Sequence, residues 1–207
     1  LAGALDALGE KAPRIQGRRA LDAGASTGGF TDVLLRRGAA SVVAVDVGYG
    51  QLAWKLQSDP RVEVHDRTNV RTLDPASVAP APGLVVGDMS FISLTLVLPA
   101  LVAAAAPDAD FLLMVKPQFE IGKERLGHGG VVRNPEHHVE TVENVARCAI
   151  GLGLDIAAIA PSPLPGPSGN VEYFLYMRRD YPEPINPQEL TEHIRRAVAE
   201  GPAGGAL

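Results

Sequence analysis

A glycine-rich turn near the start of the sequence has the composition of a ligand-binding turn. The apolar run from Arg19 leads into Asp22-Ala23-Gly24-Ala25-Ser26-Thr27-Gly28-Gly29-Phe30-Thr31, where an amphipathic helix begins. Such a turn presents backbone N–H groups at a helix N-terminus, where the amides and the helix dipole bind a carboxylate or phosphate. Asp46 closes the next apolar run and suits a bidentate hydrogen bond to a ribose diol. Together they predict a cleft for a nucleoside-bearing cofactor, whose identity the spacing leaves open.

A second group of polar residues, Asp88, Lys116 and Glu172, has the types needed for proton chemistry. Asp88 and Lys116 end two apolar runs, and Glu172 stands at the start of another. In doubly wound folds ligands bind beyond the carboxyl ends of the strands. If the last strand is reversed, its start lies at this same edge, and Glu172 comes close to Asp88 and Lys116. A partly desolvated lysine has a lowered pKa and can steer or accept a proton, while flanking carboxylates hold it in place.

Each of these three residues also has a simpler interpretation. Lys116 could be an end-of-strand charge that reaches to water, and Glu172 could face solvent. Asp88 could cap the helix that follows it, although Ser90 or Ser93 suits that position better. The predicted convergence of all three side chains favours the catalytic interpretation.

Apolar runs alternate with helical patterns along the chain. All-apolar runs such as Phe111-Leu112-Leu113-Met114-Val115 are typical of a parallel sheet that is covered on both faces. Strands are predicted near 19–24, 41–47, 62–66, 83–89, 110–116, 154–160 and 172–178. Helices are predicted near 1–9, 28–38, 50–57, 93–105, 135–152 and 187–200. This pattern indicates an α/β fold with helices on both faces of a mostly parallel sheet.

Two connections depart from simple strand–helix alternation. The segment from Pro161 to Asn170 has no helical pattern, which permits antiparallel pairing and predicts that the seventh strand inserts as a hairpin. The segment 117–134 is long, charged and glycine-rich, so we expect a lid or binding loop there. The chain also opens inside a helical pattern without a methionine or cap, and we expect it to be part of a longer protein.

Composition restricts the class of protein. The 207 residues suffice for one domain with a sizeable core, and no run is long and apolar enough to span a bilayer. A single cysteine, Cys148, excludes an internal disulfide and a cysteine-based metal cluster. With no signal peptide evident, we expect a cytoplasmic protein. The net charge of -5 does not favour nucleic-acid binding by this chain as a whole.

Several other residues are weaker candidates for a functional role. The five histidines show no metal-ligand spacing, so no metal is expected, and the pair His137 and His138 is expected on a helix surface. Asn69 is either a turn residue or a contact to the edge of an adenine. Tyr49 and Trp54 could wall an adenine or ribose pocket, with ordinary helix packing as the alternative for Trp54.

Five segments, in order and spread over nearly the whole chain, resemble the TlyA (haemolysin A) proteins. These proteins are ribosomal RNA 2′-O-methyltransferases with an FtsJ-like catalytic domain. The segments are the glycine turn 22–31, Asp46-Val47-Gly48-Tyr49-Gly50-Gln51-Leu52, Asp88-Met89-Ser90-Phe91-Ile92-Ser93, Val115-Lys116-Pro117-Gln118-Phe119-Glu120 and Ser168-Gly169-Asn170-Val171-Glu172-Tyr173-Phe174.

The resemblance implies a Rossmann-like class I methyltransferase fold with a seven-stranded, mostly parallel sheet whose last strand is reversed. It implies S-adenosyl-L-methionine-dependent methylation of a cytidine 2′-hydroxyl in 16S or 23S ribosomal RNA, with ribosomal subunits as partners. It assigns the cofactor contacts to Asp22, Gly24, Ser26, Gly28, Gly29, Asp46, Asn69 and Asp88. FtsJ-like enzymes use a Lys-Asp-Lys-Glu tetrad, and its last three members fall on Asp88, Lys116 and Glu172.

The sequence departs from the family pattern at its start. The first lysine of the tetrad is expected just upstream of Leu1, and Lys11 comes too late to replace it. The family's N-terminal S4-like RNA-binding domain is also missing. Residues 1–207 are therefore expected to be the methyltransferase domain of a longer protein, impaired on RNA by itself.

Two rival functions remain open at this point. A nicotinamide-dependent oxidoreductase would use a similar turn, but Ser26 occupies the place of the second glycine in G-x-G-x-x-G. A non-catalytic RNA-binding or haemolysin-type module would not need Lys116 and its neighbours. The sequence contains no strongly amphipathic membrane segment to support the haemolysin interpretation.

Overall fold

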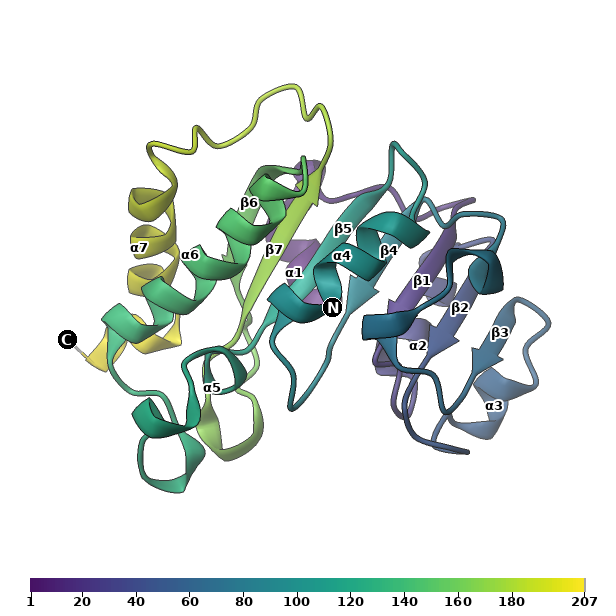
Figure 1. The fold of residues 1–207 in the computed structure, drawn as a ribbon, viewed down its shortest axis with the longest axis horizontal. Coiled ribbons are helices and arrows are strands. Elements are labelled where there is room, and N and C mark those ends of the chain that lie inside the picture. The colour runs from purple at the N-terminus through teal and green to yellow at the C-terminus, as the bar shows by residue number, and fades with distance from the viewer. Residues whose placement is uncertain (207) are drawn as a thin grey trace.

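The computed structural model describes residues 1–206, and a single seven-stranded sheet forms its centre. The strand order is β3-β2-β1-β4-β5-β7-β6 (Figure 1). The strands are β1 (Arg19–Ala23), β2 (Ser41–Val45), β3 (Val62–His65), β4 (Leu84–Gly87), β5 (Asp110–Val115), β6 (Asp155–Pro161) and β7 (Tyr173–Arg178). All seven were predicted from the apolar runs, and each bound lies within two residues of the predicted one.

Strand β7 is reversed, as the missing helix before it predicts. It pairs antiparallel with β5 on one side and with β6 on the other, whereas the other neighbouring pairs are parallel. In the register of β5 with β7, Val115 lies opposite Tyr173. The next residue outward on each strand, Lys116 and Glu172, therefore lies at the same edge of the sheet.

Helices cover both faces of the sheet, because the strand residues alternate between two apolar cores. Helices α4, α6 and α7 pack on the face that carries Leu21, Val85 and Phe111. Helices α1, α2 and α3 pack on the opposite face. The helices are α1 (Ala2–Leu8), α2 (Gly29–Arg36), α3 (Trp54–Gln57), α4 (Leu94–Ala104), α5 (Pro117–Glu120), α6 (Pro135–Gly151) and α7 (Leu190–Glu200).

Two expectations about helices were wrong. The helix expected over 50–57 begins only at Trp54, because the preceding residues form a loop that ends with an extended backbone at Ala53. The segment 117–134, expected as a loop, opens with α5, where Pro117 occupies the first helical position that suits proline. None of the helices in the described part of the chain has the length and apolar character needed to cross a bilayer.

Candidate active site

The glycine turn after β1 brings three strands together at their carboxyl ends. The N–H groups of Gly24 and Ala25 both donate to the carbonyl oxygen of Val45, at 2.9 and 3.0 Å. Gly24 has φ +78°, and a Cβ there would lie 2.7 Å from the backbone oxygen of Asp88. Only glycine fits such a position, so the turn can pack directly against the end of β4.

Asp46 connects this turn to the loop that follows β2. One carboxylate oxygen, Oδ2, accepts the Ser26 N–H at 2.8 Å, and Oδ1 accepts the Gly48 N–H at 2.8 Å. Each oxygen has a further lone pair, because a carboxylate oxygen can accept two hydrogen bonds. Asp46 therefore fixes two loops and keeps acceptors for a ligand such as a ribose diol.

These loops border a pocket of about 580 Å³, a volume typical of sites for small molecules. Of the predicted cofactor residues, the pocket lining includes Gly24, Ser26, Asp46, Asn69 and Asp88. Sequence reasoning did not assign the remaining lining residues, which are Val47, Gly48, Gln51, Val70, Met89, Ser90, Phe91, Ile92 and Val97. Several of these residues are neighbours of predicted ones in the segments that resemble the family, and this proximity could have indicated them.

Three predicted cofactor residues, Asp22, Gly28 and Gly29, lie outside the lining of this pocket. Gly28 has φ +102° and caps α2, and a Cβ there would collide with the side chain of Leu56 in α3. Gly29 is the first residue of α2. Gly28 therefore lets the turn enter the helix, whereas a Cβ at Gly29 would meet no atom within 4 Å.

Asp22 is a buried support beneath the turn. Its side chain is fully buried, and Oδ2 accepts a hydrogen bond from the Thr31 hydroxyl at 2.7 Å. Oδ1 is buried without a hydrogen-bond partner among the described residues. Burial raises the pKa of Asp22 to about 7, against the opposing effect of the Thr31 hydrogen bond.

The raised pKa of Asp22 predicts a pH dependence of stability. Because the unfolded chain loses this proton near pH 4 and the folded chain near pH 7, Asp22 makes folding less favourable as the pH rises between these values. Substitution Asp22→Asn removes that titration. We expect the unfolding free energy of the variant, relative to the unsubstituted protein, to rise by roughly 2 kcal/mol between pH 5 and pH 7. Urea denaturation at several pH values measures this difference in unfolding free energy. A difference that does not change with pH would contradict the raised pKa of Asp22.

The structure brings the three predicted catalytic residues together, with Lys116 between the two acids. Its Nζ is 2.5 Å from Oδ1 of Asp88 and 3.9 Å from Oε1 of Glu172. The ammonium also donates to the Ser90 hydroxyl at 3.3 Å. Lys116 and Glu172 are buried, while Asp88 is partly exposed and lines the pocket together with Ser90. Asp88 and Ser90 therefore connect the lysine to the pocket.

Glu172 is held from several sides. Gln118 Nε2 donates to its Oε1 at 3.1 Å. Burial raises the pKa of Glu172, whereas the nearby Lys116 and Gln118 lower it. Gly166 lies against the carboxylate so closely that a Cβ there would overlap it. The interpretation of Glu172 as a solvent-facing residue is therefore wrong.

The wall behind Glu172 is formed by two loops that one asparagine joins. Asn170 is buried, and its side chain donates to Gly130 O at 2.9 Å and accepts the Val132 N–H at 3.0 Å.

His138 is also buried, which corrects the expectation that it lies on a helix surface. Its Nε2–H donates to Val132 O at 2.9 Å, and Nδ1 accepts the Tyr173 hydroxyl at 3.1 Å.

Glu120 connects the loop that carries Asp88 to the one that carries Lys116. Its Oε2 accepts the Ser93 hydroxyl at 2.5 Å, and its Oε1 accepts the Leu94 N–H at 2.8 Å. The carboxylate thus caps α4, whose N-terminus favours negative charge. Ser93 is the N-cap residue, as expected from the sequence.

Removal of this connection should loosen the site. We expect Glu120→Ala to lower the unfolding free energy by about 1–3 kcal/mol, because buried donors lose their acceptor. Glu120→Gln, which keeps an acceptor for Leu94, should lose less. Exposed Glu124 provides the control, and Glu124→Ala should change stability by less than about 0.5 kcal/mol. Denaturant unfolding compares the three, and equal losses for Glu120→Ala and Glu124→Ala would argue against the connection.

The aromatic residues near the pocket differ from expectation. Tyr49 and Trp54 are 69% and 77% exposed and do not line the pocket, so neither walls it in this structure. Phe91 does line it, is 89% exposed and has φ +63°, a conformation that is rare for a bulky residue. Its ring packs against Phe119, with centroids 4.9 Å apart. Asn69 is a turn residue, since its side chain accepts the Arg71 N–H at 3.0 Å, and it also lines the pocket.

The fold and the pocket together define a Rossmann-like methyltransferase of the S-adenosylmethionine-dependent class. A solved S-adenosylmethionine-dependent methyltransferase from Mesorhizobium loti shares the fold at 15% identity, with a TM-score of 0.59 over 85% of this chain and 96% of that one. The chain belongs to the FtsJ-like methyltransferase family, whose family model matches residues 1–179.

Two closer relatives agree with this membership. The 16S/23S rRNA (cytidine-2'-O)-methyltransferase TlyA of Mycobacterium tuberculosis is 55% identical over 98% of this chain and 74% of that protein. A solved structure described as "Putative hemolysin from Streptococcus thermophilus" is 37% identical, with a TM-score of 0.86 over 96% of this chain and 72% of that one.

Proposed function

We propose that this protein transfers a methyl group from S-adenosylmethionine to the 2′-hydroxyl of a cytidine in ribosomal RNA. The observation that carries the proposal is the buried Lys116 amine, held by Asp88 and Glu172 at the border of the pocket. A relative with 55% identity is named for this reaction on 16S and 23S rRNA. This substrate supports ribosomal subunits as partners and the cytoplasm as the place of action.

The pocket residues fit this cofactor. Gly24 and Gly48 line it at positions where a Cβ would meet neighbouring atoms, so glycine lets the loops around the pocket pack closely. Asp46 offers charged acceptors for the ribose diol, and Val47, Val70 and Ile92 supply apolar walls for an adenine ring. When bound, S-adenosylmethionine supplies a methyl group that its sulfonium makes electrophilic.

The chain's own residues must then position the ribose and remove its proton. Lys116 first releases one ammonium proton to solvent. Its neutral Nζ then accepts the 2′-hydroxyl proton as the hydroxyl oxygen bonds to the methyl carbon and the carbon–sulfur bond breaks, which leaves a neutral thioether. Asp88 and Glu172 hold the amine in place and stabilise the ammonium that forms. Most of the remaining acceleration comes from alignment, because in-line displacement needs the oxygen and the methyl group in register.

Phe91 is the residue best placed to contact the base of the target nucleotide. Its exposed ring at the pocket border gives a nucleobase a flat stacking surface, a contact worth about 1–3 kcal/mol per base. We expect Phe91→Ala to raise the KM for RNA by about tenfold and to change cofactor affinity by less than about threefold, because the ring lines the pocket but is largely exposed, while Phe91→Trp keeps activity. Steady-state kinetics with RNA as the varied substrate measures this. Leu96→Ala on α4, also at an exposed apolar residue, is the control.

The proposal is tested by mapping 2′-O-methylation on ribosomal RNA from cells with and without the intact gene. We expect the methyl mark to disappear from one or more cytidines when the gene is deleted and to return on complementation. Identical maps would overturn the proposed substrate. Calorimetry with S-adenosylmethionine and with NAD distinguishes the methyltransferase from a nicotinamide-dependent oxidoreductase. A methyltransferase should bind S-adenosylmethionine, whereas an oxidoreductase would bind only NAD.

A further inference from the structure

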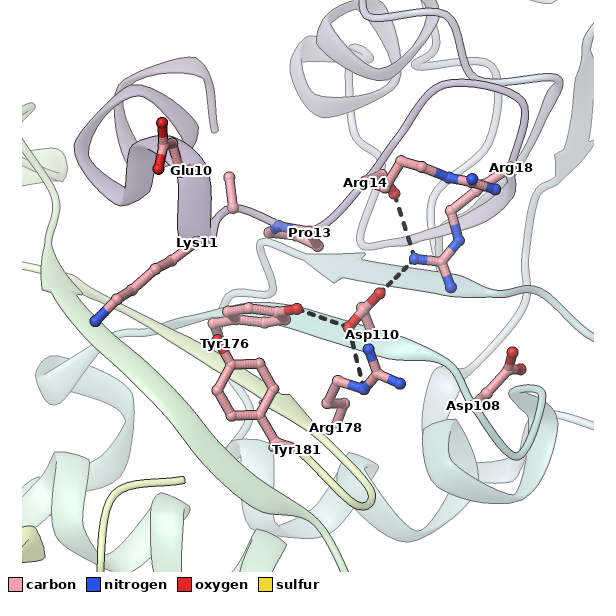
Figure 2. A pocket seen from close by; sticks show the side chains of 11 residues that line it. Glu10, Lys11, Pro13, Arg14, Arg18, Asp108, Asp110, Tyr176, Arg178 and Tyr181 are labelled. Atoms are coloured by element: carbon pink, nitrogen blue, oxygen red, sulfur yellow. Dashed lines mark hydrogen bonds and ion pairs between the residues drawn. The ribbon is translucent and has the colours of Figure 1, made fainter. Parts of the chain in front are cut away.

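A second pocket, of about 530 Å³, lies at the opposite edge of the sheet from Lys116. It is formed where β5 and β1 begin and β7 ends, so the length of β5 separates it from the catalytic lysine by about 20 Å. Figure 2 shows its lining, and we call it the basic pocket. Its charged residues are Lys11, Arg14, Arg18 and Arg178 together with Glu10, Asp108 and Asp110.

The interior of the basic pocket holds more positive than negative charge. Asp110 is buried and forms an ion pair with Arg18, while the Arg178 Nε lies 3.9 Å from its Oδ1. The Tyr176 hydroxyl donates to the same Oδ1 at 2.8 Å, so it adds a neutral donor (Figure 2). Two guanidinium groups therefore share one carboxylate.

Donors in this pocket also lack acceptors. Arg178 Nε is buried and has no hydrogen-bond partner among the described residues. A buried unpaired donor in a native protein commonly marks the place of a water molecule or an ion. Arg14 and Lys11 are exposed, and within the described chain their side chains form no ion pair. The rim acids Glu10 and Asp108 likewise pair with none of these cations.

We propose that the basic pocket binds a phosphate group. Arginine presents a planar fork of N–H donors that matches phosphate oxygens. The guanidinium groups of Arg18 and Arg178 both reach Asp110 here, and Arg14 lines the same pocket. The open rim admits either a phosphodiester of an RNA backbone or a free phosphate compound, because both present the same oxygens. The site is distinct from the proposed methyl-transfer site, so its existence does not depend on the function proposed above.

The test is an NMR titration of the protein with inorganic phosphate, observing the arginine Nε–H signals. We expect saturable shifts for Arg178 and Arg18, and an affinity weakened at least about tenfold in Arg178→Gln and about fivefold in Arg14→Gln. Arg14 is exposed, so its variant should fold even if Arg178→Gln does not. Arg196→Gln, at an exposed arginine on α7, should bind as the unsubstituted protein does.

A second titration with a short single-stranded RNA separates the two sources of phosphate. Displacement of inorganic phosphate from the same arginine signals identifies the RNA backbone as the ligand, whereas phosphate binding without RNA competition identifies a free phosphate compound. Absence of saturable shifts at these arginines, or equal affinity in the Arg14→Gln and Arg196→Gln proteins, would overturn the proposal.

Discussion

Substitution of Lys116 by alanine is expected to reduce methyl transfer by about a thousandfold or more, which is the usual contribution of a positioned acid–base group. The amine is 2.5 Å from Asp88 and lies outside the pocket lining, so its loss removes proton acceptance without removing a pocket wall. Affinity for S-adenosylmethionine should therefore change by less than about threefold. Single-turnover methyl transfer and calorimetry on the same preparation measure the two quantities.

A suitable comparison for Lys116→Ala is a lysine with similar chemistry away from the site. Lys55 lies on α3 and pairs with Asp32 on the protein surface, so Lys55→Ala should keep full activity. A Lys116→Ala protein that turns over at the unsubstituted rate would exclude Lys116 as the proton acceptor. Equal losses in turnover and in cofactor affinity would instead indicate a structural role.

Substitution of Asp46 by alanine is expected to weaken S-adenosylmethionine binding by about a hundredfold. The carboxylate holds the Ser26 and Gly48 N–H groups and offers charged acceptors at the pocket, and a hydrogen bond to a charged group contributes about 1.5–3 kcal/mol. The affinity of Asp46→Asn should lie between those of the unsubstituted protein and Asp46→Ala, because one carboxylate oxygen is replaced by an NH₂ group that cannot accept from a backbone N–H. Isothermal calorimetry measures the dissociation constants.

Asp59 serves as the matched control for Asp46. It is an acid on the neighbouring surface whose partner is Arg61, and it does not line the pocket. Asp59→Ala should bind the cofactor normally. If Asp46→Ala bound as tightly as Asp59→Ala, the assignment of the pocket to the cofactor's ribose would fail.

Much of the site could be predicted from the sequence because strand order converts distant residues into neighbours. Parallel strands place Asp88 and Lys116 at one edge, and the helix-free connection before β7 brings Glu172 to it. Asp46 and Gly24 were likewise predictable, since an acid after a strand and a glycine that permits close approach are local features.

Other features depend on contacts that a local pattern does not encode. His138 is buried because loop residue Val132 and Tyr173 of β7 satisfy both ring nitrogens, and neither neighbour is evident from the helix pattern. The positive φ of Phe91 is rare for a bulky residue, so the residue type gives no indication of it. The basic pocket combines Arg14 and Arg18 with Arg178, residues that meet only through the sheet.

The most direct test of the account is to incubate the full-length protein with ribosomal subunits and S-adenosylmethionine that carries a deuterated methyl group, and to analyse the digested RNA by nucleoside mass spectrometry. If Lys116 accepts the 2′-hydroxyl proton, we expect deuterium in 2′-O-methylcytidine, with none above background in the Lys116→Ala reaction. Label on a base rather than on the ribose, or equal ribose labelling by the Lys116→Ala protein, would contradict it.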